Sequence, residues 1–388
     1  MIYLDFAATT KPSAEATEIF AEINQKFWAN PNSMHDLGIK AEAVLSLARK
    51  TILESFFTPV CRDVMYYVSP NAAEQYNVIF TSSATESNNL IIKSVISRNS
   101  NKQFITSNIE HPSVREVFLS SLPDGRFVFL DVDENGTVPF DTLEKAITPD
   151  TALVSIMHVN NEIGSINDVF EMAKIVKRKN KSTLFHSDFS QSVGKIPVDL
   201  LLNSDIDFIS FSGHKIECVK GIGALIFKKN IQINPLFHGG GQEFGFRAST
   251  SNTAAAAALA KSVKTAIKLQ KERYEKVQIL QKILLDNLSQ LPAIQINTPK
   301  NSSPYIVNFS VIKQKSETIL RALSQKEIYI STVSACSAKK NRESYVVKAL
   351  TGDSKRAESS LRVSLSAETT ENEILTFVDE LKTILKNL

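Results

Sequence analysis

The sequence predicts an α/β protein with two domains, and three features indicate this fold class. The chain has 388 residues, which is more than one small core usually holds and enough for two domains. Short apolar runs rich in β-branched residues alternate with helical patterns through the central region, as in a mainly parallel sheet covered by helices on both faces. A long alanine-rich helical pattern from Thr253 to about Leu288 then leads into a second α+β pattern.

Seven apolar runs are expected to form the strands of a large, mainly parallel sheet. They are Asn77–Thr81, Gln103–Ser107, Phe127–Leu130, Leu153–Met157, Thr183–Ser187, Asp207–Phe211 and Ala224–Phe227. Helical patterns such as Ser87–Ser97 and Val169–Lys179 lie between several of them. Right-handed crossovers bring the carboxyl ends of such strands to one edge of the sheet, where ligands bind.

We expect the large domain to cover residues 15–255, and residues 1–14 together with 256–388 to form the smaller α+β domain. In the smaller domain we predict strands near Ile306–Ser310 and Leu361–Leu365 and an amphipathic helix over Glu371–Leu385. Residues 58–77 form a long, turn-rich connection, which is unusual in a compact domain and is either functional or mobile.

Composition excludes several classes of protein. Hydrophobic residues make up 43% and charged residues 22% of the chain, which is ordinary for a globular protein, and the net charge is 44 − 41 = +3. A nucleic-acid-binding protein needs a concentrated basic face, which this charge balance does not predict. Three cysteines without metal-ligand spacing predict neither disulfides nor a metal site. Without a signal sequence or membrane-spanning run, the expected location is the cytoplasm.

Two polar segments directly follow predicted strands. Lys215 follows Ser212 and His214, so it could form a Schiff base while its neighbours bind a phosphate group, although a lone lysine there is more often a surface residue. Asp188 could lie under the pyridine nitrogen of a cofactor and keep it protonated, and Gln191 could donate to the phenolic oxygen of the ring. For Asp188, capping of a helix is an equally good interpretation.

Three further strand ends carry polar residues. Thr85 opens a helix whose first N–H groups could bind phosphate, and Ser83 with Glu86 could at the same time form a capping box. His111 could stack on a cofactor ring, and Asn161 could contact the ring oxygen; in isolation a loop histidine and a turn asparagine are the commoner interpretations. Five such signals at successive strand ends predict one shared crevice.

These residues together resemble the cysteine desulfurases, a branch of the class-V aminotransferase-like enzymes of fold type I that use pyridoxal 5'-phosphate. The resemblance runs nearly end to end and is specific because the motifs recur in order. They are YLDFAATT at 3–10, NPNSMH at 30–35, TSSATESNN at 81–89, EHPSV at 110–114, MHVNNEIG at 157–164, HSDFSQSVGKIPVD at 186–199, SFSGHKI at 210–216, GGGQEFGFRAST at 239–250, SACSA at 334–338 and SSLRVSLS at 359–366.

The resemblance implies a role for each matched position. Lys215 would be the Schiff-base lysine, and Asp188, Gln191, His111 and Asn161 would contact the cofactor ring. The positions that would bind the phosphate are Ala84, Thr85, Ser212, His214 and, from the neighbouring subunit of a homodimer, Thr250. Arg362 would bind the substrate carboxylate, a natural partner for a two-pronged guanidinium.

Cys336, in the loop 331–342, matches the cysteine that becomes a persulfide when sulfur is taken from L-cysteine and alanine is released. Lys339, Lys340 and Arg342 would favour its thiolate form. The implied partners are a sulfur-acceptor or iron–sulfur scaffold protein and a second copy of the chain.

The chain departs from the family pattern at several loops: Val333, Glu217–Lys220, Ala248–Ser249 and Ser366–Ala367, besides the connection 58–77. Several of these changes lose glycines, which can reshape loops without removing a catalytic atom. Two alternatives therefore stay open, a related lyase or aminotransferase acting on selenocysteine or another amino acid, and a catalytically weakened scaffold relative.

Overall fold

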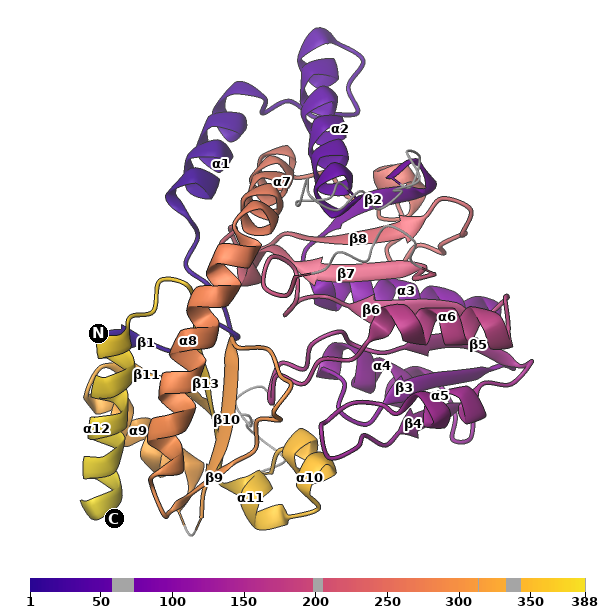
Figure 1. Cartoon of the computed structure of the whole chain (residues 1–388). Helices are drawn as coiled ribbons and strands as arrows, with labels where there is room; N and C mark the ends of the chain where they lie inside the picture. Colours follow the sequence, from indigo (N-terminus) through magenta and orange to yellow (C-terminus); the bar gives the residue numbers. More distant parts are fainter. Residues whose placement is uncertain (58–72, 198–204, 313, 333–342, 388) are drawn as a thin grey trace.

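The computed structural model describes residues 1–57, 73–197, 205–312, 314–332 and 343–387, and it confirms the predicted α/β class. A seven-stranded sheet of order β2-β8-β7-β6-β5-β3-β4 forms the centre of the larger part (Figure 1). Its strands are β2 (Tyr76–Thr81), β3 (Gln103–Ser107), β4 (Phe127–Leu130), β5 (Thr151–Ser155), β6 (Leu184–Asp188), β7 (Phe208–Ser212) and β8 (Gly223–Lys228).

The large sheet is mainly parallel, as predicted, and β8 is the exception. β8 pairs antiparallel with both β2 and β7, whereas β7-β6, β6-β5, β5-β3 and β3-β4 are parallel pairs. All seven predicted strands are present, with ends shifted by up to two residues. β5 ends at Ser155, two residues before the predicted end, and the Met157 N–H beyond it donates to the Glu110 side chain.

Helices cover both faces of this sheet. Successive side chains of each strand point to opposite faces, so the apolar residues of the strands need a covering layer on both sides. On one face, Val78, Ile209 and Ile226 pack with α2 (Asp36–Phe57), α5 (Phe140–Ala146), α6 (Val169–Lys179) and α7 (Thr253–Lys268). On the other face, Ile79 and Phe208 pack with α3 (Ala84–Arg98) and α4 (Pro112–Ser121). α1 (Ala14–Lys26) packs beside α7 (Figure 1).

The predicted helix over 253–288 is two helices with a break at Leu269, α7 and α8 (Gln270–Ser289). The break separates two environments: α7 packs on the core of the large sheet, whereas α8 packs on a second core. Because the amphipathic pattern continues through Leu269, periodicity alone did not reveal the break between the two helices.

The second core surrounds an antiparallel sheet of order β12-β13-β10-β9. Its strands are β9 (Ile294–Ile296), β10 (Ile306–Val311), β12 (Ser331–Thr332) and β13 (Ser360–Ser364). Around it lie α9 (Ser316–Gln325), α10 (Tyr345–Thr351), α11 (Ser354–Glu358) and α12 (Glu371–Asn387). The strands and terminal helix predicted for the smaller domain are therefore present; the domain boundaries at 14/15 and 255/256 remain a prediction.

The N-terminal segment pairs with strands near the C-terminal end of the chain, in a two-stranded sheet of its own and through a bridge to the second sheet. β1 (Ile2–Tyr3) pairs in parallel with β11 (Ile328–Tyr329), and Asp5 bridges to Ser364 of β13. Farther along, Thr10 N–H donates to His214 O at 2.8 Å. Residues 2–10 thus run from the second sheet to the end of β7.

None of the helices in the described part of the chain combines the length and the apolar character that a membrane span requires.

Candidate active site

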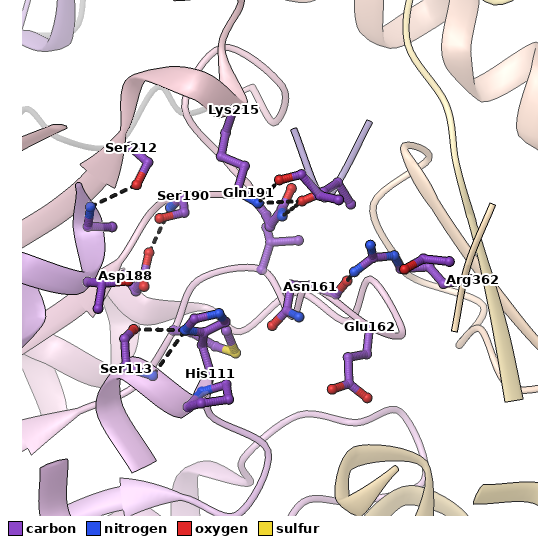
Figure 2. Close-up of a pocket in the computed structure, with 18 of the residues that line it drawn as sticks. His111, Ser113, Asn161, Glu162, Asp188, Ser190, Gln191, Ser212, Lys215 and Arg362 are labelled. Atoms are coloured by element: carbon purple, nitrogen blue, oxygen red, sulfur yellow. Dashed lines mark hydrogen bonds between the residues drawn. The ribbon is translucent and has the colours of Figure 1, made fainter. Parts of the chain in front are cut away.

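A cavity of about 390 Å³ lies where the ends of the large-sheet strands meet the N-terminal segment and the second sheet. Ten of the predicted site residues line it: Ala84, Thr85, His111, Asn161, Asp188, Gln191, Ser212, His214, Lys215 and Arg362. In the view of Figure 2, Asp188 and Arg362 lie on opposite sides of the cavity, with Lys215 above and His111 below. The crevice predicted from the strand ends is therefore present, and the roles assigned to its residues remain a prediction.

Lys215 reaches the cavity because a single 3-10 turn, Gly213–Lys215, directly follows β7. Its ammonium group donates to Ala7 O at 2.6 Å and to Ala8 O at 2.7 Å (Figure 2). Gly213 fits closely in this turn, since an added Cβ would lie 3.0–3.1 Å from side-chain atoms of Leu259, Cys218 and Ile222, which would have to shift slightly. The amine of the predicted Schiff-base lysine is therefore held by the N-terminal segment.

Asp188, the last residue of β6, is buried, and both of its carboxylate oxygens accept hydrogen bonds. Oδ2 accepts from Asn88 Nδ2 of α3 at 2.8 Å, and Oδ1 accepts from Ser190 N at 2.8 Å. Hydrogen bonds to the charged form compensate for burial. The described residues that follow Asp188 form turns rather than an α-helix, so Asp188 does not cap an α-helix there. A fixed, buried carboxylate can hold a protonated ring nitrogen.

His111 is the N-cap of α4, and its Nδ1 accepts from Ser113 N at 3.1 Å. Because Nδ1 accepts, the tautomer inferred from this bond carries its proton on Nε2. Burial is the main cause that lowers the pKa of His111, with Asp188 opposing and Lys215 adding to the effect. A neutral imidazole with a fixed ring orientation therefore lines the cavity and suits stacking on a ring.

The N-terminus of α3 forms another wall of the cavity. Ser212 Oγ accepts from Ala84 N at 2.7 Å, and Ser83 Oγ accepts from Glu86 N. The predicted capping box is half formed, because the Glu86 carboxylate instead accepts from Ser82 N at 2.7 Å. Backbone N–H groups at a helix start, with the helix dipole, attract anions, so this wall, which includes Thr85, can hold a phosphate group.

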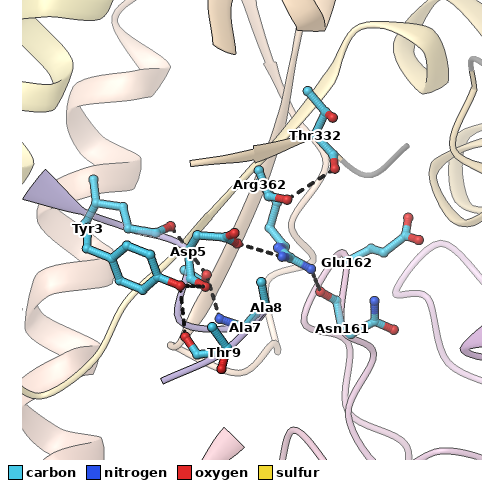
Figure 3. A network of polar contacts seen from close by, with 12 residues as sticks. Tyr3, Asp5, Ala7, Ala8, Thr9, Asn161, Glu162, Thr332 and Arg362 are labelled. Atoms are coloured by element: carbon cyan, nitrogen blue, oxygen red, sulfur yellow. Dashed lines mark hydrogen bonds and ion pairs between the residues drawn. The ribbon is translucent and has the colours of Figure 1, made fainter. Parts of the chain in front are cut away.

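Arg362 of β13 is buried, and two of its guanidinium nitrogens are already engaged (Figure 3). Nη1 donates to Asn161 O at 2.8 Å, and Nη2 donates to Asp5 Oδ1 at 2.8 Å. Nε is buried and has no hydrogen-bond partner in the described structure. Asn161, predicted to offer its side-chain amide, uses its backbone carbonyl to hold Arg362. A buried guanidinium with an unsatisfied donor at a cavity is a site for an anionic ligand.

The two remaining predicted site residues are Thr250 and Cys336. Thr250 is exposed and does not line it, which is compatible with a role across an interface but does not test that role. Cys336, with Lys339, Lys340 and Arg342, lies outside the described residues. Cys218, the alternative thiol, is fully buried, and burial raises its pKa to about 11, so it is not a thiolate nucleophile at neutral pH.

Several lining residues had no assigned role from the sequence: Asp5, Ala7, Ala8, Glu162, Ser190 and Tyr345. The YLDFAATT motif was the available signal for the first three. Glu162 is a buried acid whose pKa burial raises to about 7, and it accepts from Ser344 Oγ at 2.6 Å. Asp5 and Tyr345 come from elements that only the tertiary structure brings to the strand ends, whereas Glu162 follows the same strand as Asn161.

The lining residues fit pyridoxal phosphate. The cavity offers a lysine amine, a buried carboxylate, a neutral imidazole and a helix N-terminus. Two of its lining residues, Ser190 and Arg362, also carry a buried polar atom without a partner in the described structure, Oγ and Nε respectively. No group of His, Cys, Asp or Glu side chains among the described residues could hold a metal ion.

The chain is similar to known proteins over nearly its whole length. The family model described as "Aminotransferase class-V" matches residues 2–377. The chain is 36% identical to a "NifS/IcsS protein homolog" of Lactobacillus delbrueckii, covering 97% of this chain and 95% of that protein. It is 34% identical to a "Cysteine desulfurase IscS" of Clostridium botulinum, over 99% and 94% of the two chains. A solved "NIFS-LIKE PROTEIN" superposes with a TM-score of 0.88 at 32% identity over the full length of both chains.

Proposed function

The chain belongs to the class-V aminotransferase family, and from this membership we propose a mechanism for a pyridoxal-phosphate-dependent cysteine desulfurase. The observation that carries the proposal is that one cavity joins Lys215, Asp188 and His111 to a buried Arg362 with an unsatisfied donor. These are an amine, an acid, a ring-stacking group and a carboxylate-binding group. An amino-acid substrate of a pyridoxal-phosphate enzyme needs all four.

In this mechanism Thr85, Ser212 and His214 would hold the cofactor's phosphate at the N-terminus of α3, while His111 would stack on its ring and Asp188 would bind its ring nitrogen. Bound there, pyridoxal phosphate would supply an electron sink for the pair released when the substrate loses its α-proton. Asp188 holds a proton on the ring nitrogen. Gln191 donates from Nε2, which already bonds Ala7 O at 2.9 Å and has a second hydrogen for the ring oxygen.

Arg362 binds the carboxylate of L-cysteine, and this orients the α-carbon toward Lys215. Lys215, as a neutral amine, removes the α-proton and later returns it. Cys336, as thiolate, attacks the substrate sulfur, and the carbon–sulfur bond breaks with its electron pair going to the β-carbon. The β-carbon takes up the proton that the substrate thiol brought, the sulfur stays on Cys336 as a persulfide, and alanine leaves. A soft, deprotonated sulfur is the nucleophile suited to this step.

The direct test is mass spectrometry of the cofactor-loaded protein after incubation with L-cysteine. We expect added sulfur on the Cys336 peptide and release of alanine. Cys336→Ser should abolish both while the cofactor stays bound, because a serine hydroxyl is too basic to replace a thiolate. Cys218→Ser is the matched control and should behave like the wild type; the opposite pattern in the two variants would move the nucleophile to Cys218.

We further propose a homodimer that delivers sulfur to an acceptor or iron–sulfur scaffold protein. The support for the dimer is an exposed Thr250 together with large exposed apolar side chains, among them Trp28 at 72%, Met34 at 97% and Phe244 at 55% exposure. Sedimentation analysis of the loaded protein tests it. A monomer with full cofactor occupancy would refute the role of Thr250 across an interface.

A further inference from the structure

A chain of buried polar side chains extends from the cavity wall into the large sheet, and the amide of Asn88 lies at its branch point. Asn88 Nδ2 donates to Asp188 Oδ2 at 2.8 Å and to Ser113 Oγ at 2.9 Å, and Asn88 Oδ1 accepts from Ser210 Oγ. Asn88 is fully buried, so water does not compete for these three hydrogen bonds. One side chain of α3 therefore connects the end of β6 to the start of α4.

The chain continues to His186 of β6, a fully buried histidine that the proposed mechanism does not use. His186 Nε2 lies 3.1 Å from Ser210 Oγ, and His186 Nδ1 lies 2.8 Å from Ser155 Oγ of β5. Burial holds the pKa of His186 well below its ordinary value, although the charge of Asp188 opposes this effect. The ring is therefore neutral at pH 7 and carries a single proton, on one nitrogen or the other.

The charge of Asp188 decides the direction of the hydrogen bonds along this chain. A carboxylate can only accept, so the NH₂ of Asn88 must face Asp188 and its oxygen must face Ser210. The single hydroxyl proton of Ser210 is then donated to Asn88 Oδ1, so Ser210 Oγ has to accept from His186. His186 therefore carries its proton on Nε2, and its Nδ1 accepts from Ser155 Oγ.

The second branch of the chain reaches His111 in the cavity wall. The other N–H of Asn88 is donated to Ser113 Oγ, which leaves the hydroxyl proton of Ser113 for His111 Nδ1, 2.8 Å away (Figure 2). His111 Nδ1 thus accepts from the hydroxyl and, at 3.1 Å, from the backbone N–H of Ser113. The proton of the neutral ring is left on Nε2, where it can be donated to a ligand in the cavity.

We propose that Asn88 is a positioning residue that couples Asp188 to His111 before the cofactor binds. Its amide holds Asp188 as the carboxylate that a protonated ring nitrogen needs, and through Ser113 it holds His111 in the Nε2–H form. Asn88 is not among the residues that line the cavity, so it acts through these side chains. The proposal rests on the proposed function for the roles of Asp188 and His111, whereas the direction of the hydrogen bonds follows from the described side chains.

The test locates the ring protons in the cofactor-free protein. NMR spectra that correlate ring nitrogens with carbon-bound ring protons distinguish the two tautomers of a neutral histidine, and the chain has only six histidines to assign. In the wild type we expect both His186 and His111 to carry the proton on Nε2. A His186 proton on Nδ1 would overturn the proposal even if no variant folds, because Ser210 would then donate to His186 instead of Asn88.

Two substitutions separate the charge of Asp188 from the amide of Asn88. Asp188→Asn leaves one acceptor oxygen, which Ser190 N occupies at 2.8 Å in the wild type. The new NH₂ then faces Asn88, reverses that amide and moves the His186 proton toward Nδ1. Asn88→Leu keeps the charge but interrupts the chain, so His186 should become a mixture of both tautomers. A His186 that stays in the Nε2–H form in either folded variant would overturn the proposal.

Affinity for pyridoxal phosphate tests the positioning role itself. Asn88→Leu should weaken cofactor binding about tenfold or more, since Asp188 loses a charge-assisted hydrogen bond. An unchanged affinity in the folded variant would contradict that role. Asn287→Leu is the matched control, because the Asn287 amide donates to Ile283 O at 2.9 Å within α8, and both its cofactor affinity and its histidine tautomers should equal those of the wild type.

Alanine release by the loaded wild type is scored separately from the tautomers and the cofactor affinity. Its absence, with the expected tautomers and affinities, would refute the desulfurase function and leave the role of Asn88 intact. Normal alanine release with the His186 proton on Nδ1 would do the opposite. The two failures are therefore distinguishable.

Discussion

The two sides of the cavity are built in different ways. We define the strand-end side as Thr85, His111, Asp188, Ser212 and Lys215. These residues follow successive strands of one sheet, and some of them form hydrogen bonds to residues nearby in sequence, as in the His111–Ser113 and Asp188–Ser190 pairs. The seam side, defined as Asp5, Asn161 and Arg362, joins residues as far as 357 positions apart in the chain.

This difference indicates a division of labour between the two sides. The strand-end side supplies most of the groups proposed to hold the cofactor, whereas the seam side supplies Arg362 for the substrate carboxylate. Because the seam forms only when the N-terminal segment and β13 meet the large sheet, changes there should affect the substrate and leave the cofactor bound. The predictions below test this separation, beginning with the largest expected effect.

Lys215→Ala should abolish alanine release, by about 10⁴-fold or more, because the amine that holds the cofactor and moves the α-proton is lost. The visible absorbance of covalently bound cofactor should disappear. Spectra and alanine assays before and after borohydride reduction check this. A variant that stays coloured through a link to another lysine would contradict the assignment.

Arg362→Ala should weaken cysteine binding by about 2–4 kcal/mol, since a desolvated charge-assisted contact is lost. The cofactor should remain bound, because no strand-end residue changes. Spectral titration with cysteine measures both properties, and Arg178→Ala, at a side chain 59% exposed, is the control for charge loss. Loss of the cofactor together with cysteine affinity would break the proposed separation.

Glu110→Gln tests the scaffold of the strand-end side through pH. Burial raises the pKa of Glu110 from 4.5 to about 8, while its Oε1 accepts from Ser107 Oγ and Met157 N. The folded protein therefore holds a proton that the unfolded chain releases above about 4.5. This contribution is fully present below 4.5 and is lost as the pH rises through about 8.

Relative to Glu110→Gln, which has no proton to lose, the wild type should lose roughly 1 kcal/mol of stability per pH unit across this window. Denaturant unfolding of both proteins at pH 5 to 8 measures the difference. Parallel stability curves would mean that Glu110 is already ionised in the folded protein.

Substitution of Asp5 should give the smallest of the expected effects, and it tests how the seam side holds Arg362. Asp5→Ala should weaken cysteine binding about tenfold, or ~1.4 kcal/mol, because Arg362 loses a fixed acceptor. Asp5→Asn keeps an acceptor oxygen and removes a competing charge, so its affinity should stay within about threefold of the wild type. Equal losses in both variants would show that the charge of Asp5, not its geometry, matters.

Much of the strand-end side could be predicted from the sequence because its groups follow local patterns. A β-branched run, a polar residue at its end and a helix start are all short-range features, and parallel strands gather such ends at one edge. Lys215, Asp188 and His111 were placed in this way. Thr250 and Cys336 depended on the resemblance, and the described structure tests neither.

The sequence by itself determined the α/β class, the strand-end residues and the type of chemistry, since periodicity, composition and ordered motifs are properties of the chain alone. Only the tertiary structure decided that Ala7 O and Ala8 O hold Lys215, and that Asp5 and Asn161 O hold Arg362. These contacts join segments that no sequence period relates. Three of them also use backbone carbonyls, which every residue carries and no motif can mark.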